Sequence, residues 1–334
     1  MGLLGAVIRR EFSVPNTLKY ATEYHTPIMV DEVIRYLQVR PGARFVDGTA
    51  GGGGHSAAIL DAGAPSAQLL SIDRDPEAIA QVQARLAGAG DRFRVVQGNY
   101  GDVERICAEN DFSPVDGFLV DAGVSSHQLD EAERGFSFRR AGPLDMRMGP
   151  DAPSLAEYLA DVEPRELMRV LSVYGEIRSA KRVALAILEA FEAGKLHSTV
   201  DLTAVVEDTI GGGARGGGQK TKIHPATLVF QGLRIAINRE LDTLEAAVRA
   251  IPKVVKPGGR AAFISFHSLE DRIVKHGFRE LANDCVCPPD FPICACDERA
   301  KVKVLTSRAL TAGPAELEQN PRARSAKLRV VEVL

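Results

Sequence analysis

Between residues 44 and 121, short apolar runs alternate with segments whose apolar positions recur at helical spacing. Pro76 suits the first turn of a helix, and Ile79, Val82 and Leu86 follow it on the same helical face. The apolar runs have the length of buried strands; they cover residues 44–46, 68–72, 93–96 and 117–120. This alternation predicts an α/β fold built on a parallel sheet.

The pattern changes after residue 131, and only helical periodicity remains as far as residue 222. Four segments carry it: residues 155–159, 164–173, 179–191 and 199–209. The glycine-rich stretch 211–218 has too little side-chain surface to pack and is expected to be mobile. Beyond it we predict a long helix over 225–249, a turn at 256–259 and a strand over 260–266. The chain is thus divided into an N-terminal extension (1–24), a discontinuous α/β domain (25–130 and 223–334) and an inserted helical domain (131–222).

The chain carries a glycine-rich turn between its first strand and the following helix. It reads Phe45-Val-Asp-Gly-Thr-Ala-Gly-Gly-Gly-Gly-His-Ser56, and the next strand ends on Asp73. Glycines allow the backbone to approach a ligand closely, and an acid about twenty residues after such a turn suits the ribose hydroxyls of an adenosine cofactor. The third glycine of a dinucleotide fingerprint is absent, which argues against a nicotinamide-dependent oxidoreductase. Asp47 before the glycines suits a cationic group such as the amine of S-adenosylmethionine.

Asp121 ends the fourth strand, at the edge of the sheet where open α/β folds hold their ligands. A methyltransferase needs a hydrogen-bond acceptor beside the attacking atom, and Asp121 is a candidate for it. The alternative is an acid that only caps the next turn.

Composition bounds the class of protein. The chain has 334 residues, 45% of them hydrophobic, and a net charge of −3, which by itself does not indicate a nucleic-acid partner. Residues 321–329 form a basic run that suits either phosphate contact or a solvated edge. No apolar run reaches the length of a membrane span, and residues 1–24 lack the apolar run of a signal peptide. We therefore expect a cytoplasmic enzyme with no membrane partner, although a mitochondrial presequence remains an alternative.

Four of the five cysteines form two C-x-C pairs: Cys285 with Cys287, and Cys294 with Cys296. Four thiols within twelve residues could hold zinc. Their spacing is tighter than the C-x-x-C of common zinc sites, however, and disulfides are rare in the cytosol. The sequence favours reduced or redox-sensitive thiols and no metal, with a structural metal as the alternative.

Several motifs together resemble the RsmH (also called MraW) family of small-subunit ribosomal RNA cytosine-N4 methyltransferases. They are His25-Thr-Pro-Ile-Met-Val-Asp-Glu32, Asp47-Gly-Thr49 with Gly53-Gly-His-Ser56, Ile72-Asp-Arg-Asp-Pro76, Asp121 with Gly123-Val-Ser-Ser126, Glu133-Arg-Gly-Phe-Ser-Phe138, Gly142-Pro-Leu-Asp-Met-Arg-Met148, His224-Pro-Ala-Thr227, Ile264-Ser-Phe-His-Ser-Leu-Glu-Asp-Arg-Ile-Val-Lys275 and Asn320-Pro-Arg-Ala-Arg-Ser325. The resemblance implies a Rossmann-like, S-adenosylmethionine-dependent methyltransferase whose helical insertion recognises substrate. Its target would be the exocyclic N4 of a cytosine in the decoding region of 16S ribosomal RNA, with the small ribosomal subunit as partner.

The resemblance also implies roles for individual residues. Cofactor contacts would come from Gly53, Gly54, His55, Asp73, Tyr100, Asp121 and Gln128, and catalysis from Asp121 with His224, Ser265 and His267 as secondary candidates. RNA contacts would come from Arg134, Arg139, Arg140, Arg147, Arg322, Arg324, Lys327 and Arg329. Phe136 and Phe138 suit buried anchors better than base stacking.

Three departures from the family pattern and two alternatives remain. Ala122, His127 and Leu228-Val229 depart from that pattern. In addition, Asp121-Ala-Gly-Val lacks the Pro-Pro-aromatic motif of other amino-directed methyltransferases. A methyltransferase of this class that acts on another RNA and a non-catalytic RNA-binding assembly protein are the alternatives.

Overall fold

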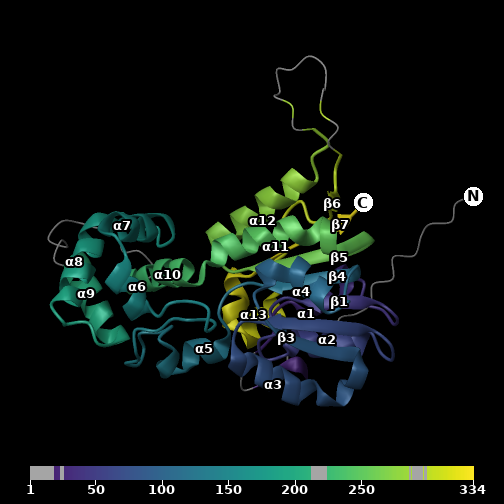
Figure 1. Ribbon diagram of the computed structural model, residues 1–334, viewed down its shortest axis with the longest axis horizontal. Coiled ribbons are helices and arrows are strands. Elements are labelled where there is room, and N and C mark those ends of the chain that lie inside the picture. Colours follow the sequence, from purple (N-terminus) through teal and green to yellow (C-terminus); the bar gives the residue numbers. More distant parts are fainter. Residues whose placement is uncertain (1–18, 23–25, 212–223, 286, 288–295, 297–298) are drawn as a thin grey trace, which may run out of the picture.

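A seven-stranded sheet forms the centre of the computed structural model, which describes residues 19–22, 26–211, 224–285, 287, 296 and 299–334 (Figure 1). Its strands are β1 (Arg44–Asp47), β2 (Gln68–Asp73), β3 (Phe93–Gln97), β4 (Val115–Asp121), β5 (Val255–Ser265), β6 (Val302–Val304) and β7 (Lys327–Val333). They lie in the order β3-β2-β1-β4-β5-β7-β6. The first five strands are parallel, and β7 runs antiparallel to both of its neighbours. The predicted α/β fold and its four leading strands are confirmed.

Helices cover both faces of the sheet. They are α1 (Val30–Tyr36), α2 (Gly54–Ala62), α3 (Pro76–Leu86), α4 (Val103–Glu109), α11 (Glu240–Val254), α12 (Ser268–Leu281) and α13 (Pro314–Gln319). On one face α4, α11 and α12 bury Ile106, Ile251 and Phe278. On the other face α1 and α2 bury Val33 and Ile59. Because apolar side chains cover both faces, β4 is buried along its whole length except at Asp121.

A second, wholly helical lobe projects to one side of the sheet (Figure 1). It contains α6 (Leu155–Asp161), α7 (Pro164–Val173), α8 (Ala180–Glu192) and α9 (Thr199–Gly211), reached through the short helix α5 (Ser126–Asp130). The four predicted helical segments are confirmed, and the described residues between 131 and 211 contain no strand. The helices share one apolar core, which is separate from the two cores of the sheet.

The helical lobe extends further along the chain than we predicted. Helix α10 (Pro225–Asn238) packs against α7 and α9, and Val229, Phe230 and Leu233 belong to the core of the lobe. The single helix predicted over 225–249 is in fact two helices, because Arg239 adopts a left-handed conformation (φ 51°, ψ 40°) between α10 and α11. The boundary between lobe and sheet therefore falls at Arg239 and not at residue 222.

The turn predicted at residues 256–259 lies inside β5. Gly258 has a φ of 77°, and the pairing register with β4 shifts between Val115 and Gly117. Residues 256–259 stand opposite the single residue Asp116, so the predicted turn forms an irregularity within the strand.

Two predicted segments cannot be compared with the structure. Most of the N-terminal extension (1–24) and of the glycine-rich stretch 211–218 lies outside the described residues. In the part of the chain that the structure describes, no helix combines the length and apolar character that crossing a bilayer requires.

Candidate active site

A crevice lies at the carboxyl ends of β1, β2 and β4, where parallel sheets place their ligand sites. Six of the seven predicted cofactor residues line it: Gly54, His55, Asp73, Tyr100, Asp121 and Gln128. Gly53 is not among the lining residues. It begins α2 with a φ of 72°, and a Cβ atom there would lie 2.9 Å from Val82 of α3. Glycine at this position therefore serves the packing of two helices.

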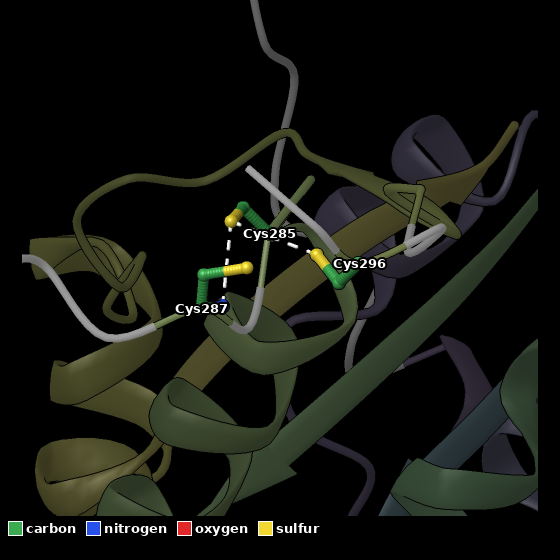
Figure 2. A group of neighbouring side chains, drawn as sticks. All are labelled: Cys285, Cys287 and Cys296. Atoms are coloured by element: carbon green, nitrogen blue, oxygen red, sulfur yellow. Dashed lines mark hydrogen bonds between the residues drawn. The ribbon is translucent and has the colours of Figure 1, made fainter. Parts of the chain in front are cut away.

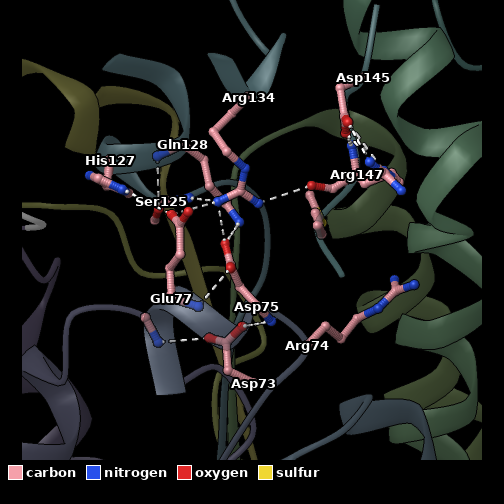
Figure 3. A network of polar contacts seen from close by, with 12 residues as sticks. Asp73, Arg74, Asp75, Glu77, Ser125, His127, Gln128, Arg134, Asp145 and Arg147 are labelled. Atoms are coloured by element: carbon pink, nitrogen blue, oxygen red, sulfur yellow. Dashed lines mark hydrogen bonds and ion pairs between the residues drawn. The ribbon is translucent and has the colours of Figure 1, made fainter. Parts of the chain in front are cut away.

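Asp73 presents its carboxylate to the crevice from the end of β2. Its Oδ2 atom accepts a hydrogen bond from the Gly51 backbone N–H (2.8 Å), and its Oδ1 atom accepts one from Asp75 N–H (2.9 Å) (Figure 3). Each oxygen keeps a lone pair for a ligand. Burial raises the pKa of Asp73 to about 6 despite these hydrogen bonds.

Asp47 does not lie where we predicted. It is fully buried and absent from the crevice lining. Its Oδ2 atom accepts from the Ser56 hydroxyl (2.7 Å), and its Oδ1 atom accepts from the Thr49 backbone N–H (3.1 Å). The Thr49 hydroxyl in turn accepts from the Asp121 backbone N–H (2.8 Å). Asp47 therefore holds the glycine-rich turn against the end of β4 and does not face a ligand; burial raises its pKa to about 7.

Asp121 and His55 form a buried pair inside the crevice. The Oδ2 atom of Asp121 lies 3.6 Å from the Nδ1 atom of His55, while its Oδ1 atom is buried and has no hydrogen-bond partner. The Nε2 atom of His55 lies 2.8 Å from the Ile28 carbonyl oxygen. Burial, with the charges of Asp47 and Glu270, holds the pKa of Asp121 well above its usual value. Burial also lowers the pKa of His55 to about 4, so the imidazole is neutral near pH 7.

A network of hydrogen bonds fixes the wall of the crevice behind Gln128 (Figure 3). The Gln128 side chain accepts from Ser125 N–H (3.0 Å) and donates to Asp75 Oδ2 (2.8 Å). Arg134 also donates to Asp75 Oδ2 (2.7 Å), as well as to Glu77 and to the Arg147 carbonyl oxygen. Asp75 is buried, and the two side chains that donate to its Oδ2 atom, Gln128 and Arg134, follow it in the chain by 53 and 59 positions. Gln128 is thus positioned by the fold before any ligand arrives.

A second cavity of about 790 Å³ adjoins the crevice. Gly123, Val124 and Phe266 line both spaces, so the two are adjacent there. Aromatic side chains from the helical lobe line the second cavity; they are Phe136, Phe138 and Phe230. Phe136 is buried, and the Phe138 ring packs edge-on against Phe230 with centroids 5.1 Å apart. The prediction that Phe136 and Phe138 are packing anchors is confirmed, although both also face the cavity.

The three secondary catalytic candidates do not gather at Asp121. Ser265 is buried, and its hydroxyl donates to the Lys327 carbonyl oxygen (3.4 Å). His224 begins α10, where its Nδ1 atom accepts from Ala226 N–H and its Nε2 atom lies 3.0 Å from Glu207. Neither residue lines the crevice or the second cavity. His267 lines the second cavity, but both of its ring nitrogens are directed at Glu270, because it caps α12.

Half of the predicted RNA-binding cations are committed to carboxylates of the protein. Arg134 pairs with buried Asp75, and Arg147 forms a bidentate pair with Asp145. Lys327 and Arg329 both bind Asp271, and Arg329 is 8% exposed. The burial of Arg134 and Arg329 argues against phosphate contact by these two residues, whereas Arg147 and Lys327 each keep 41% of the side chain exposed.

The remaining four cations lie at or beside the mouth of the second cavity. Arg139, Arg322 and Arg324 line it, and Arg140 is the exposed neighbour of Arg139. Arg322 forms an exposed pair with Asp130 (2.9 Å). Within the described residues, Arg139, Arg140 and Arg324 form no ion pair. These three cations are thus available to an anionic partner.

Phe266 and Arg74 are among the lining residues to which the sequence analysis gave no role in the site. Phe266 lies between the crevice and the second cavity, and Arg74 lines the crevice while donating to Asp151 (2.9 Å) and to the Asn238 carbonyl oxygen. Both stand inside motifs that carry the family resemblance, beside Ser265 and Asp73 respectively. Their position next to predicted residues was the available signal.

Comparison of the sequence with known proteins identifies the family of the chain. The family model described as MraW methylase family matches residues 22–334. "Ribosomal RNA small subunit methyltransferase H" of Anaeromyxobacter sp. (strain K) is 49% identical over 310 residues, covering 93% of this chain and 98% of that protein. The protein of the same name from Geobacter sulfurreducens is 48% identical over 311 residues, covering 93% and 99%. Among solved structures, TrmN from Thermus thermophilus overlays with a TM-score of 0.42 at 12% identity, covering 92% of this chain and 49% of that one.

Proposed function

Because the chain belongs to the MraW methylase family, we propose that it transfers a methyl group from S-adenosylmethionine to small-subunit ribosomal RNA. The acceptor atom in this proposal is the exocyclic N4 of a cytosine in the decoding region of 16S ribosomal RNA. The observation that carries it is a crevice with two partly buried carboxylates, Asp73 and Asp121, which shares three lining residues with a second cavity. That cavity is lined by Arg139 and Arg324, which form no ion pair within the described residues.

The residues of the crevice fit S-adenosylmethionine. Asp73 has a free lone pair on each oxygen, which suits two ribose hydroxyls. Burial raises the pKa values of Asp73 and Asp121, and the one cation of the lining, Arg74, is paired with Asp151. A ligand with a sulfonium and an ammonium group would supply the missing positive charge. A Cβ atom on Gly51 would meet only the Thr49 carbonyl oxygen within 4 Å, at 3.9 Å, so the backbone leaves space for the ligand.

S-adenosylmethionine supplies an electrophilic methyl group when it is bound. The task of the protein is to hold an amine in line with that group and to accept its proton, because a cytosine N4 lone pair is delocalised into the ring. Asp121 lines the crevice two residues before Gly123, which lines both the crevice and the second cavity. Its Oδ1 atom, which has no hydrogen-bond partner, would accept a hydrogen bond from N4–H and take that proton as the C–N bond forms. The methyl–sulfur bond would break at the same time and leave its electron pair on sulfur, as a thioether.

The second cavity would receive the target base. Its aromatic lining from Phe136, Phe138 and Phe230 offers surface against which a base removed from its stack can pack. Arg139, Arg140 and Arg324 would bind phosphates around the entrance, which supplies affinity without sequence choice. Substrate recognition then depends on the helical lobe and on the C-terminal segment together. Action on ribosomal subunits would place the enzyme in the cytoplasm.

The proposal is tested by incubating the purified protein with labelled S-adenosylmethionine and small subunits that lack the decoding-site N4 methyl group. Mass spectrometry of nuclease fragments then locates the label. Label on the N4 of that cytosine supports the proposal. Label on another nucleotide would assign a different RNA target, and cofactor binding without transfer would favour a non-catalytic assembly protein.

A further inference from the structure

The segment between α12 and β6 brings three cysteine sulfur atoms together (Figure 2). The Sγ atoms of Cys285, Cys287 and Cys296 all lie within 4.8 Å of one another, and those of Cys285 and Cys296 are 3.7 Å apart. None of the three residues lines the crevice or the second cavity. The cluster is therefore unrelated to the proposed methyl transfer and calls for its own explanation.

The spacing of the sulfur atoms distinguishes a metal site from a disulfide. A disulfide requires sulfur atoms about 2.05 Å apart, and none of the described cysteines forms one. Thiolates at about 2.3 Å from a tetrahedral zinc ion lie about 3.8 Å from one another. The distance of 3.7 Å between Cys285 and Cys296 matches the edge of such a tetrahedron.

Hydrogen bonds around the cluster favour thiolates and hold both ends of the segment. The Cys287 backbone N–H donates to the Cys285 sulfur (3.4 Å), a contact that stabilises negative charge on sulfur. Asn283 binds the Cys285 backbone, and Asp284 accepts from Ala300 N–H (3.0 Å). Lys301 N–H donates to the Leu281 carbonyl oxygen (2.8 Å), which joins the end of α12 to the start of β6. Hydrogen bonds thus tie the chain before Cys285 to the chain just before β6.

We propose that Cys285, Cys287 and Cys296 bind a zinc ion as a structural site that closes the segment between α12 and β6. Zinc fits because thiolates are soft ligands and the ion has no redox chemistry. The close C-x-C spacing argued against a metal in the sequence analysis, but it is compatible with one because the Sγ atoms of Cys285 and Cys287 lie within 4.8 Å of each other and of the Cys296 Sγ atom. Cys294 lies outside the described residues, and the proposal does not depend on it.

The test measures metal directly in full-length, untagged protein purified without chelators. Plasma mass spectrometry should find about one zinc per chain, and Cys285→Ser and Cys287→Ser should lose it. Cys107→Ala is the matched control, because Cys107 is buried in α4 away from the cluster and should leave the zinc content unchanged. Protein reconstituted with cobalt should show sulfur-to-metal charge-transfer absorption that the two serine variants lack.

A second measurement covers the case in which the serine variants do not fold. In wild-type protein, a strong chelator should raise the number of thiols that react rapidly with a thiol reagent by at least three. A zinc content near zero with equal thiol reactivity with and without chelator overturns the proposal. Zinc that persists in both serine variants, or a disulfide among these cysteines in freshly prepared protein, overturns it as well.

Discussion

The Nδ1 atom of His55 lies 3.6 Å from the Oδ2 atom of Asp121, and the two side chains are only 5% and 9% exposed. The hydrogen bond to the Ile28 carbonyl oxygen places the ring proton on Nε2, so Nδ1 carries a lone pair. The pKa of His55 is lowered to about 4 and that of Asp121 is raised. These opposite shifts favour a proton on the Asp121 carboxyl over a proton on Nδ1 of His55. A cationic ligand beside Asp121 would displace that proton and leave the carboxylate ready to accept one from the substrate.

Asp121→Asn should separate cofactor binding from turnover. The amide keeps the size of the side chain but cannot take up a proton, so we expect kcat to fall by about 10²- to 10⁴-fold while the Kd for S-adenosylmethionine changes by less than about tenfold. Single-turnover methylation and calorimetric binding measure the two effects. Asp102→Asn, on the exposed surface before α4, is the control and should leave both unchanged. Normal turnover in Asp121→Asn would remove this residue from the chemistry.

Cofactor affinity should depend on pH through Asp73. Its pKa is about 6 in the ligand-free protein, and hydroxyl donors with a nearby cation should lower it in the complex. Binding then expels a proton below pH 6, so affinity should fall as pH falls, by up to about tenfold per pH unit. Asp73→Asn should bind more weakly and lose this dependence near pH 6. Calorimetry in two buffers of different ionisation enthalpy counts the released protons, and equal heats in both buffers would contradict the prediction.

Two groups of arginines should respond differently to substitution. Charge reversal at Arg139 and Arg140 should weaken binding to small subunits and reduce the slope of log K against log salt by about one for each lost phosphate contact. Arg105→Glu, which makes the same charge change on α4, is the control and should leave the slope unaltered. Filter binding across a salt series measures all three variants. An unchanged slope in the Arg139 and Arg140 variants would exclude these residues from the RNA contact.

Arg134→Ala should act on stability instead. The substitution removes a charged donor from Asp75, which is buried and keeps bonds only from Gln128 and from the N-terminus of α3. A hydrogen bond to a charged group contributes about 1.5–3 kcal/mol, so the free energy of unfolding should fall by about that amount. Urea denaturation measures it. A variant of normal stability with weakened subunit binding would instead return Arg134 to the RNA-binding surface.

The strand-ending acids show what the sequence can predict. Asp73 ends β2 and Asp121 ends β4, and these two strands flank β1 in the parallel sheet. The carboxyl ends of parallel strands lie at one edge, so the sheet order alone predicts that the two acids lie close together. Asp47 also ends a strand, yet its side chain turns inward to Ser56 and Thr49. The direction of a strand-ending side chain depends on the hydrogen-bond donors that the following turn and helix supply. The pattern of apolar and polar residues does not predict that direction.

The arginines show where such prediction stops. Arg134 and Arg139 are five residues apart in one basic loop, but only Arg134 meets a buried carboxylate, which stands 59 positions earlier in the chain. Arg329 likewise pairs with Asp271, because β7 lies antiparallel beside β5. The local sequence of β7 does not predict that position in the sheet. Composition identifies a cation, whereas long-range contacts decide whether it remains available to a partner.

The break between α10 and α11 can be tested by comparing the stability of glycine and alanine variants at Arg239 and at a helical control position. Arg239 has a φ of 51°, a conformation that costs a residue with a Cβ atom about 1–2 kcal/mol, so Arg239→Gly should be more stable than Arg239→Ala by about 1 kcal/mol. Arg249 lies on the exposed face of α11, where glycine should be less stable than alanine by about the same amount. Comparing glycine with alanine at each site cancels the loss of the exposed pairs that Arg239 and Arg249 form with Asp242 and Glu245. Urea unfolding midpoints measure the four variants. Opposite signs at the two positions follow from a left-handed junction at Arg239, whereas destabilisation by glycine at both would mean one continuous helix.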